Sequence, residues 1–170
     1  MRIFGLAGWS GSGKTTLMTA LIPEFVSRGI TVSTIKHAHH SFDIDQPGKD
    51  SWHHRQAGAR EVMVASGQRW ALMHELRGAP EPSLDALLEH ITPVDLVLVE
   101  GFKHHEHPKI EVYRDALGKP LLHPDDPFVV AIASDQRLAE FSRPWLPLSD
   151  ASAIANFILG HEAEPVRWHS

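Results

Sequence analysis

The sequence predicts an α/β fold with three layers, in which a mostly parallel sheet is flanked by helices and carries an antiparallel β addition. Three observations predict it. Expected strands alternate with expected helices, and several strands are apolar throughout, which is typical of parallel strands that are covered on both faces. A glycine-rich turn joins the first strand to the first helix. Two short strands in the middle of the chain have the spacing of a hairpin.

The individual elements follow from hydrophobic periodicity. Residues 3–7 are apolar and predict a strand, residues 14–27 carry apolar side chains at helical spacing and predict a helix, and the β-branched run at residues 30–35 predicts a second strand. The later elements are expected in this order: a helix at 50–57, hairpin strands at 62–65 and 69–73, a helix at 83–91, strands at 96–99, 110–113 and 128–133, and a last helix at 151–159. We assign strand 110–113, together with the hairpin, to the antiparallel addition.

Length and composition exclude several classes of protein. The 170 residues fit one domain, assigned to residues 1–160, with residues 161–170 as a tail. The chain has no cysteine, which excludes disulfides and thiolate metal sites. With 16 Lys and Arg against 21 Asp and Glu, the net charge is −5, so binding to nucleic acid through bulk charge is not expected. We find neither a membrane span nor a signal peptide, and we expect a cytoplasmic protein.

A phosphate-binding loop follows the first strand. Its residues, Gly8-Trp9-Ser10-Gly11-Ser12-Gly13-Lys14-Thr15, match the pattern G-x-x-x-x-G-K-[ST] at every defined position. Glycines allow backbone N–H groups to turn toward phosphate oxygens, and the helix N-terminus adds positive potential. We expect Lys14 to contact the β- and γ-phosphates, Thr15 to ligate Mg²⁺ and Thr16 to reach the α-phosphate. A strand before the loop and a helix after it predict the P-loop NTPase fold.

A P-loop protein also needs an acidic residue on a neighbouring strand. Glu100 ends the strand at 96–99, at the edge where ligands bind in open α/β sheets. Asp45 lies in a polar segment after the second strand and is another candidate to hold Mg²⁺ or to orient water. Lys14, Asp45 and Glu100 are therefore the expected catalytic residues, and Thr15, Asp45 and Glu100 are the expected metal ligands.

The chain has 13 histidines, and eight of them fall in two segments, 37–54 and 104–107. Both segments follow strands and are expected at the ligand-binding edge of the sheet. One interpretation is a transition-metal site, although the spacing matches no recognised ligand pattern. The other is anion binding by loop histidines, which would strengthen as the pH falls toward the ordinary His pKa. His37 and His39 are accordingly expected to contact the bound ligand.

The late strand at 128–133 is followed by Ser134 and Asp135. A carboxylate at this edge could accept hydrogen bonds from N1–H and the exocyclic amine of guanine. The Asn-Lys-x-Asp form that is familiar for guanine recognition is absent. An aspartate that only begins a loop is the alternative interpretation.

Several blocks of sequence together resemble the MobB family of molybdopterin-guanine dinucleotide biosynthesis adapter proteins. A P-loop alone occurs in many families, and the other blocks make the resemblance specific. The blocks cover nearly the whole chain except the tail, at residues 9–16, 35–40, 47–51, 68–73, 98–103, 109–110, 114–115 and 133–135.

The resemblance implies a GTP-binding protein with weak Mg²⁺-dependent GTPase activity. It implies a homodimer that assists the molybdenum cofactor guanylyltransferase, and it suggests molybdopterin as a further ligand. Residues 11–16 would bind phosphates and Mg²⁺, Glu100 would be the second acidic motif, and Ser134 and Asp135 would contact guanine. We find no arginine finger or catalytic glutamine in the sequence, which predicts slow hydrolysis. Two other functions stay open: a P-loop small-molecule kinase and a His-rich metallochaperone GTPase.

Overall fold

The computed structural model describes residues 1–38, 42–139 and 141–161. They divide into two compact units. The sheet unit comprises residues 1–37 and the described residues from 89 onward, and the hairpin unit comprises residues 38–88. The predicted boundary at residue 160 coincides with the end of the last helix, and most of the predicted tail lies outside the described residues.

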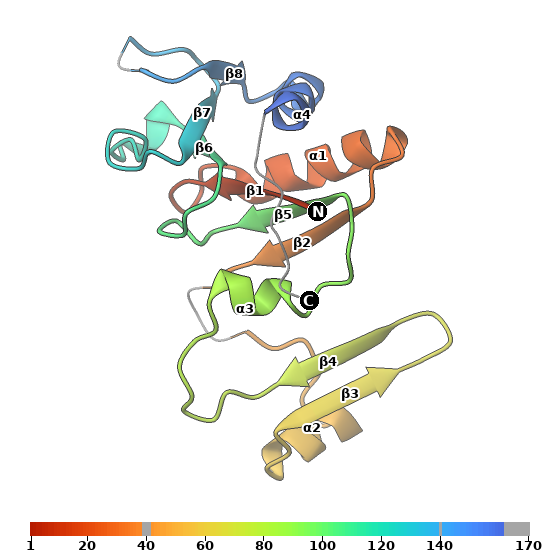
Figure 1. The fold of residues 1–170 in the computed structure, drawn as a ribbon. Coiled ribbons are helices and arrows are strands. Elements are labelled where there is room, and N and C mark those ends of the chain that lie inside the picture. The colour runs from red at the N-terminus through yellow and green to blue at the C-terminus, as the bar shows by residue number, and fades with distance from the viewer. Residues whose placement is uncertain (39–41, 140, 162–170) are drawn as a thin grey trace. The chain divides into compact units, whose positions relative to one another are not determined.

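The sheet unit is built on six strands in the order β2-β5-β1-β6-β7-β8, and every neighbouring pair is parallel (Figure 1). Parallel pairing places the carboxyl ends of all the strands at one edge of the sheet. The strands are β1 (Arg2–Ala7), β2 (Val32–Lys36), β5 (Leu96–Glu100), β6 (Lys109–Tyr113), β7 (Val129–Ser134) and β8 (Trp145–Pro147).

Helices α1 (Lys14–Ser27) and α4 (Ala151–Gly160) contact each other and pack on one face of this sheet (Figure 1). The apolar stripe of α1 is buried, with Leu21 and Phe25 fully enclosed. Truncating either of these side chains to alanine would cost about 2–5 kcal/mol of stability. The core also contains alternate residues of the strands, which are Phe4, Leu6, Leu96, Leu98, Ile110, Val112, Ala131 and Ala133.

The opposite face of β6 is polar and nevertheless buried. Lys109 donates hydrogen bonds to two backbone oxygens and pairs with Asp126 at 3.0 Å. The Glu111 carboxylate accepts the backbone N–H groups of Leu122 and His123 at 2.7 and 3.0 Å. The segments that follow β5 and β6 supply these partners, so the chain covers this part of the face with loops. Buried charges are tolerated here because each has a partner.

The hairpin unit contains α2 (Asp50–Gln56), β3 (Glu61–Ala65), β4 (Trp70–His74) and α3 (Leu84–Leu88). The two strands form a separate antiparallel sheet. Arg55 is the centre of its polar contacts. The guanidinium pairs with Asp43, Asp45 and Glu75 at 2.8, 2.7 and 3.1 Å.

One face of the hairpin exposes an apolar patch beside the Glu61–His74 pair. Residues that lie directly opposite each other share a face of an antiparallel pair, and Met63 lies opposite Leu72 while Ala65 lies opposite Trp70. The exposed fractions of Met63, Trp70 and Leu72 are 63%, 65% and 41%. We call these three residues the hairpin patch.

The structure confirms the predicted fold class and corrects three details. Strand 110–113 is not antiparallel: as β6 it lies inside the main sheet, parallel to both β1 and β7. The predicted hairpin exists but forms its own two-stranded sheet. Strand β8 was not predicted, because three residues ending in proline carry too little periodic signal.

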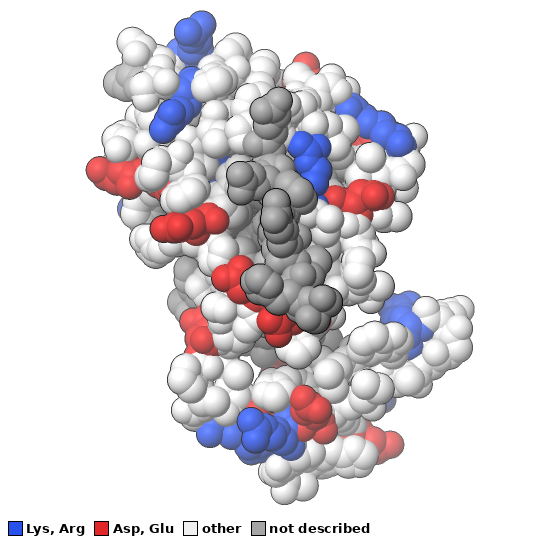
Figure 2. Space-filling model, viewed as in Figure 1, with Lys and Arg blue, Asp and Glu red and all other residues white. Residues whose placement is uncertain are grey.

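Figure 2 shows Lys and Arg side chains scattered among Asp and Glu over the described residues of one face. The expectation that the chain does not bind nucleic acid stays a prediction. Among the helices of the described ranges, none has the length and apolar character needed to cross a bilayer.

Candidate nucleotide-binding site

The P-loop connects β1, in the interior of the sheet, to the first turn of α1. Its first glycine is required by geometry. Gly8 has φ +148°, and a Cβ atom there would overlap the backbone oxygen of Val112 and lie 2.8 Å from Ser12 Oγ. The loop therefore passes too close to β6 for any side chain at this position. The predicted strand, loop and helix are confirmed at this place.

The Lys14 side chain folds back over the loop. Its Nζ donates hydrogen bonds to the backbone oxygens of Gly8 at 3.0 Å and Trp9 at 2.9 Å. Burial lowers the pKa of Lys14, and the nearby cations Lys103 and Lys36 lower it further, while Glu100 acts in the opposite direction. The cation is thus held where the loop turns, and a phosphate ligand would relieve the repulsion among these ammonium groups.

Glu100 meets the P-loop from the neighbouring strand. Because β5 pairs with β1 in parallel, Glu100 lies at the same edge of the sheet as the loop. Thr15 Oγ1 donates to Glu100 Oε1 at 3.0 Å, and Lys36 Nζ lies 3.5 Å from the same oxygen. A hydroxyl and a carboxylate oxygen side by side are hard donors that suit Mg²⁺.

His37 follows β2 at this edge. Its backbone N–H donates to the Glu100 backbone oxygen at 2.8 Å, and its ring packs on Phe102 with 4.7 Å between the ring centroids. The structure thus places His37 beside Glu100. His39 lies outside the described residues, so its predicted contact with a ligand stays a prediction.

Trp9 ties the P-loop to the segment after β6. The indole Nε1 donates to the Pro120 backbone oxygen at 2.8 Å. Lys103 Nζ and Lys119 Nζ lie 4.5 and 5.8 Å from the centre of its ring. Two more cations therefore lie beside the P-loop, in a chain whose net charge is negative.

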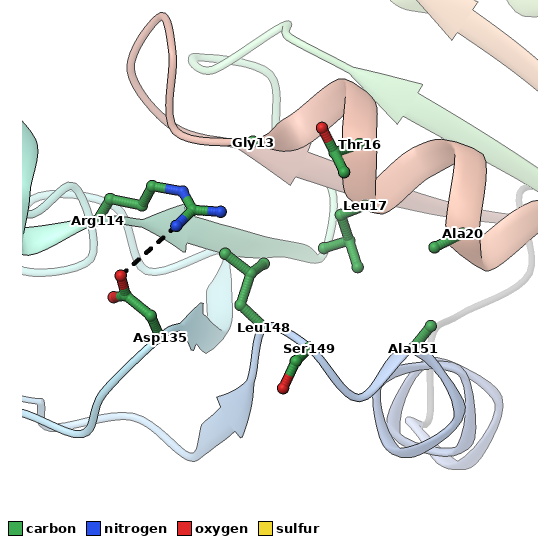
Figure 3. A pocket seen from close by; sticks show the side chains of 9 residues that line it. All are labelled: Gly13, Thr16, Leu17, Ala20, Arg114, Asp135, Leu148, Ser149 and Ala151. Carbon is green, nitrogen blue, oxygen red and sulfur yellow. Dashed lines mark hydrogen bonds and ion pairs between the residues drawn. The ribbon is translucent and has the colours of Figure 1, made fainter.

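A pocket of about 410 Å³ extends from the start of α1 toward the ends of β6, β7 and β8 (Figure 3). Its walls combine apolar side chains with a cation and a carboxylate, as ligand pockets commonly do. Arg114 and Asp135 form an ion pair at one end of it (Figure 3). The lining residues are Gly13, Thr16, Leu17, Ala20, Arg114, Asp135, Leu148, Ser149 and Ala151.

The two residues that were predicted to contact guanine differ in exposure. Asp135 lines the pocket, and about half of its side chain is exposed. Ser134 is fully buried, and its hydroxyl accepts from Trp145 Nε1 at 3.0 Å and donates to the Gln136 backbone oxygen. The serine hydroxyl therefore supports the turn after β7.

Asp45 belongs to the hairpin unit. Its carboxylate accepts both Arg55 Nη2 and Nε, at 2.7 and 3.3 Å, and only 5% of its side chain is exposed. A carboxylate held in this bidentate way already has a cation as its partner. The catalytic and metal-binding roles of Asp45 stay predictions.

One histidine of the second segment, His107, does not lie as expected. His107 is buried and packs on β1, where a Cβ atom at Gly5 would overlap its ring. Burial, together with the charges of Lys109 and His105, lowers the pKa of His107 to about 4, so its ring is neutral at physiological pH. It cannot serve as the cationic anion-binding group that the sequence predicted. Within the described ranges, which leave out His39 and His40, no group of three or more His, Asp or Glu residues could hold a metal ion.

Sequence reasoning gave no role to Arg114. Its side chain reaches the P-loop and donates from Nε to the Ser12 backbone oxygen at 3.1 Å. Two signals were available: its position directly after an expected strand, and its place in the resemblance block at residues 114–115. The first could not connect Arg114 to the P-loop while the strand was expected to be antiparallel, and the second named no role for it.

Comparison with known proteins gives consistent results. The family model of molybdopterin guanine dinucleotide synthesis protein B, MobB, matches residues 3–135. A Haemophilus influenzae protein named molybdopterin-guanine dinucleotide biosynthesis adapter protein is 46% identical over 159 residues, or 92% of this chain and 86% of the relative. An Escherichia coli protein of the same name is 44% identical over 160 residues, or 92% and 91%. A crystal structure of molybdopterin-guanine biosynthesis protein B superposes with a TM-score of 0.72 at 27% identity, covering 92% of this chain and 97% of that one.

Proposed function

The chain belongs to the MobB family, and from this membership and the geometry of the site we propose that it is a GTP-binding adapter protein. It would act in the cytoplasm in molybdopterin-guanine dinucleotide biosynthesis and hydrolyse GTP weakly with Mg²⁺. The observation that carries the proposal is that the three parts of the candidate site lie next to one another. The P-loop, the acid on β5 and the pocket that reaches Asp135 all lie at one edge of one sheet.

The phosphates of GTP would bind in the P-loop. The backbone N–H groups of residues 11–16 and the N-terminus of α1 provide the anion site, and Lys14 would turn from the loop carbonyls to the β- and γ-phosphates. The additional cations Lys36, Lys103 and Lys119 would raise the local concentration of an anionic ligand.

Mg²⁺ would be held at Thr15 and Glu100, whose oxygens are adjacent. When bound, the ion would neutralise charge on the β- and γ-phosphates. We favour Glu100 over Asp45 as the acid, since Glu100 already contacts Thr15 while Asp45 pairs with Arg55.

Guanine would occupy the pocket beyond Thr16. The base would lie among Leu17, Ala20 and Leu148, and Asp135 would accept hydrogen bonds from N1–H and the exocyclic amine. Adenine offers an acceptor at N1, so an ionised carboxylate there would disfavour ATP.

Calorimetric titration with GTP and ATP, in the presence and absence of Mg²⁺, tests this proposal. We expect tight binding of GTP, weaker binding of ATP, and a loss of about 100-fold or more in GTP affinity for Lys14→Ala. Equal affinities for GTP and ATP would exclude the guanine site.

The partner would be the molybdenum cofactor guanylyltransferase, and the protein would act as a homodimer. The hairpin patch supports an interface, because a two-stranded sheet that exposes Met63, Trp70 and Leu72 is unusual for an unpartnered surface. Sedimentation of wild type and Trp70→Glu would test the dimer, with a monomer expected for the variant.

Co-purification with the guanylyltransferase, with and without GTP, would test the partner. No interaction under both conditions would contradict the adapter role.

A further inference from the structure

We propose that Arg114 is a positioning residue that sets the base preference of this site by holding Asp135 in register with the P-loop. The inference rests on the proposed binding of GTP and adds to it a residue that decides which base is accepted. It is carried by two contacts of Arg114, one with the P-loop backbone at Ser12 and one with Asp135.

The first contact fixes Arg114 to the P-loop. Its Nε donates to the Ser12 backbone oxygen at 3.1 Å, and its Nε and Nη2 lie 3.5 Å from the point that a Cβ atom would occupy at Gly13. Backbone atoms of the loop are held by the strand and helix on either side of it. The guanidinium is therefore attached to a rigid part of the site, at the end where the pocket begins.

The second contact joins Arg114 to the base-reading carboxylate. Nη1 lies 3.5 Å from Asp135 Oδ2, and Figure 3 shows this pair at one end of the pocket. The next residues in the chain also make contact: Gln136 Nε2 approaches Asp115 Oδ2 at 3.4 Å. Two successive contacts thus link the turn after β6 to the turn after β7.

The carboxylate keeps capacity for a ligand. An ionised aspartate has about four acceptor positions on two oxygens, and Arg114 uses one of them on Oδ2. N1–H and the exocyclic amine of guanine could therefore donate to Asp135 while Arg114 remains in place. The two contacts of the guanidinium form a bridge from the P-loop backbone to the carboxylate that is proposed to read the base.

The bridge requires the planar fork of arginine. Lysine would retain the charge but has one nitrogen on a flexible stem, and it could not hold Ser12 O and Asp135 together. The side chains of Arg114 and Asp135 are 40% and 49% exposed, so their ion pair contributes little to folding stability. Substitutions at Arg114 should therefore leave a folded protein whose ligand preference can be measured.

The test compares the ratio of GTP to ATP affinities in wild type, Arg114→Ala and Arg114→Lys, by displacement of a fluorescent GDP analogue with Mg²⁺ present. We expect both variants to lower the ratio about fivefold, the size of one weakened hydrogen bond. Arg114→Lys should retain the ATP affinity of wild type, because its charge is preserved. Arg137→Ala, which removes an exposed arginine two residues after Asp135, is the matched control and should leave the ratio unchanged.

A double-mutant cycle with Asp135→Asn isolates the coupling. Asp135→Asn alone should abolish most of the preference for GTP, and adding Arg114→Ala should then change the ratio no further. Equal losses of GTP and ATP affinity in Arg114→Ala would make Arg114 a phosphate ligand and overturn the inference. So would an undiminished effect of Arg114→Ala in the Asp135→Asn background. A wild-type protein that binds GTP and ATP equally would overturn the guanine site itself, which is a separate result.

Discussion

The two units of this protein use their polar and apolar residues in opposite ways. The sheet unit encloses its apolar side chains between α1, α4 and six strands, and it gathers cations and acids at one edge. The hairpin unit exposes Met63, Trp70 and Leu72, and it pairs three acidic side chains, of which one is buried, with a single cation, Arg55.

In the proposed function this difference would separate two tasks. The cations that would bind an anionic ligand lie in the sheet unit, around Lys14 and Arg114. The exposed apolar side chains that could contact another protein lie on the hairpin patch. We therefore expect substitutions in the sheet unit to alter nucleotide binding and folding, and substitutions in the hairpin patch to alter association.

Gly8→Ala should have the largest effect. A Cβ atom there would overlap the Val112 backbone oxygen at a positive φ, and neither backbone segment can move freely. Strain and overpacking together should cost about 3 kcal/mol or more of unfolding free energy and abolish GTP binding. Chemical denaturation and titration measure the two effects.

Gly29→Ala is the matched control, because Gly29 also has a positive φ but a Cβ atom would meet nothing within 4 Å. We expect a cost of about 1 kcal/mol and unchanged GTP affinity. A Gly8→Ala variant no less stable than Gly29→Ala would contradict the close approach of the P-loop to β6.

Acid should destabilise the sheet unit through His107. Its pKa is about 4 in the folded state against 6.5 for an unperturbed histidine. The unfolded state therefore binds the proton first, so stability falls as the pH drops from about 6.5 to about 4, by about 3 kcal/mol in full. Urea denaturation of wild type and His107→Gln between pH 7 and pH 4.5 measures it.

The stability of His107→Gln should depend less on pH than that of wild type. His74→Gln, which changes an exposed histidine of the hairpin unit, should keep the wild-type dependence. The same pH dependence in all three proteins would show that His107 is not held neutral.

Glu100→Gln and Asp45→Asn compare one acid from each unit. Glu100→Gln should weaken the Mg²⁺-dependent part of GTP binding by about tenfold, since it removes a charged oxygen next to Thr15. Asp45→Asn should change it less than twofold, because its carboxylate is paired with Arg55. Titrating Mg²⁺ at fixed GTP gives both values. The reverse order would assign the metal to the hairpin unit.

Trp70→Ser should have the smallest effect on the folded chain. Because 65% of Trp70 is exposed, the unfolding free energy should change by about 0.5 kcal/mol or less at concentrations too low for association, and GTP affinity should not change. Denaturation at low protein concentration measures this. A large loss there would show that Trp70 supports the fold of the hairpin unit.

Local sequence predicted the parts of the site whose chemistry lies in a short segment. The P-loop pattern predicted that Lys14 and Thr15 lie at the start of the first helix, and the apolar strand before Glu100 predicted an acid at the same edge. In the structure Thr15 contacts Glu100. Asp135 was found because it follows a buried strand, and the structure places it in the pocket.

The rest depends on contacts that are distant in sequence. Strand β6 carries alternating polar residues, Lys109 and Glu111, which resemble those of a strand open to water on one side. Both are buried because Asp126 and the N–H groups of residues 122–123 satisfy them. Since β6 was expected to be antiparallel, Arg114 at its end could not be connected to the P-loop.

The order of strands has a consequence for how base preference could change over time. β1, β6 and β7 are successive neighbours, and the P-loop, Arg114 and Asp135 follow them in that order. With neighbouring strands about 4.8 Å apart, the backbone fixes the interval from the P-loop to Asp135, the proposed base-reading residue, at about 10 Å. Each strand end is a separate short segment. If Asp135 reads the base, a lineage or an engineer could exchange its turn for another and leave the proposed phosphate site unaltered, because the sheet sets the interval and Arg114 only orients the carboxylate within it.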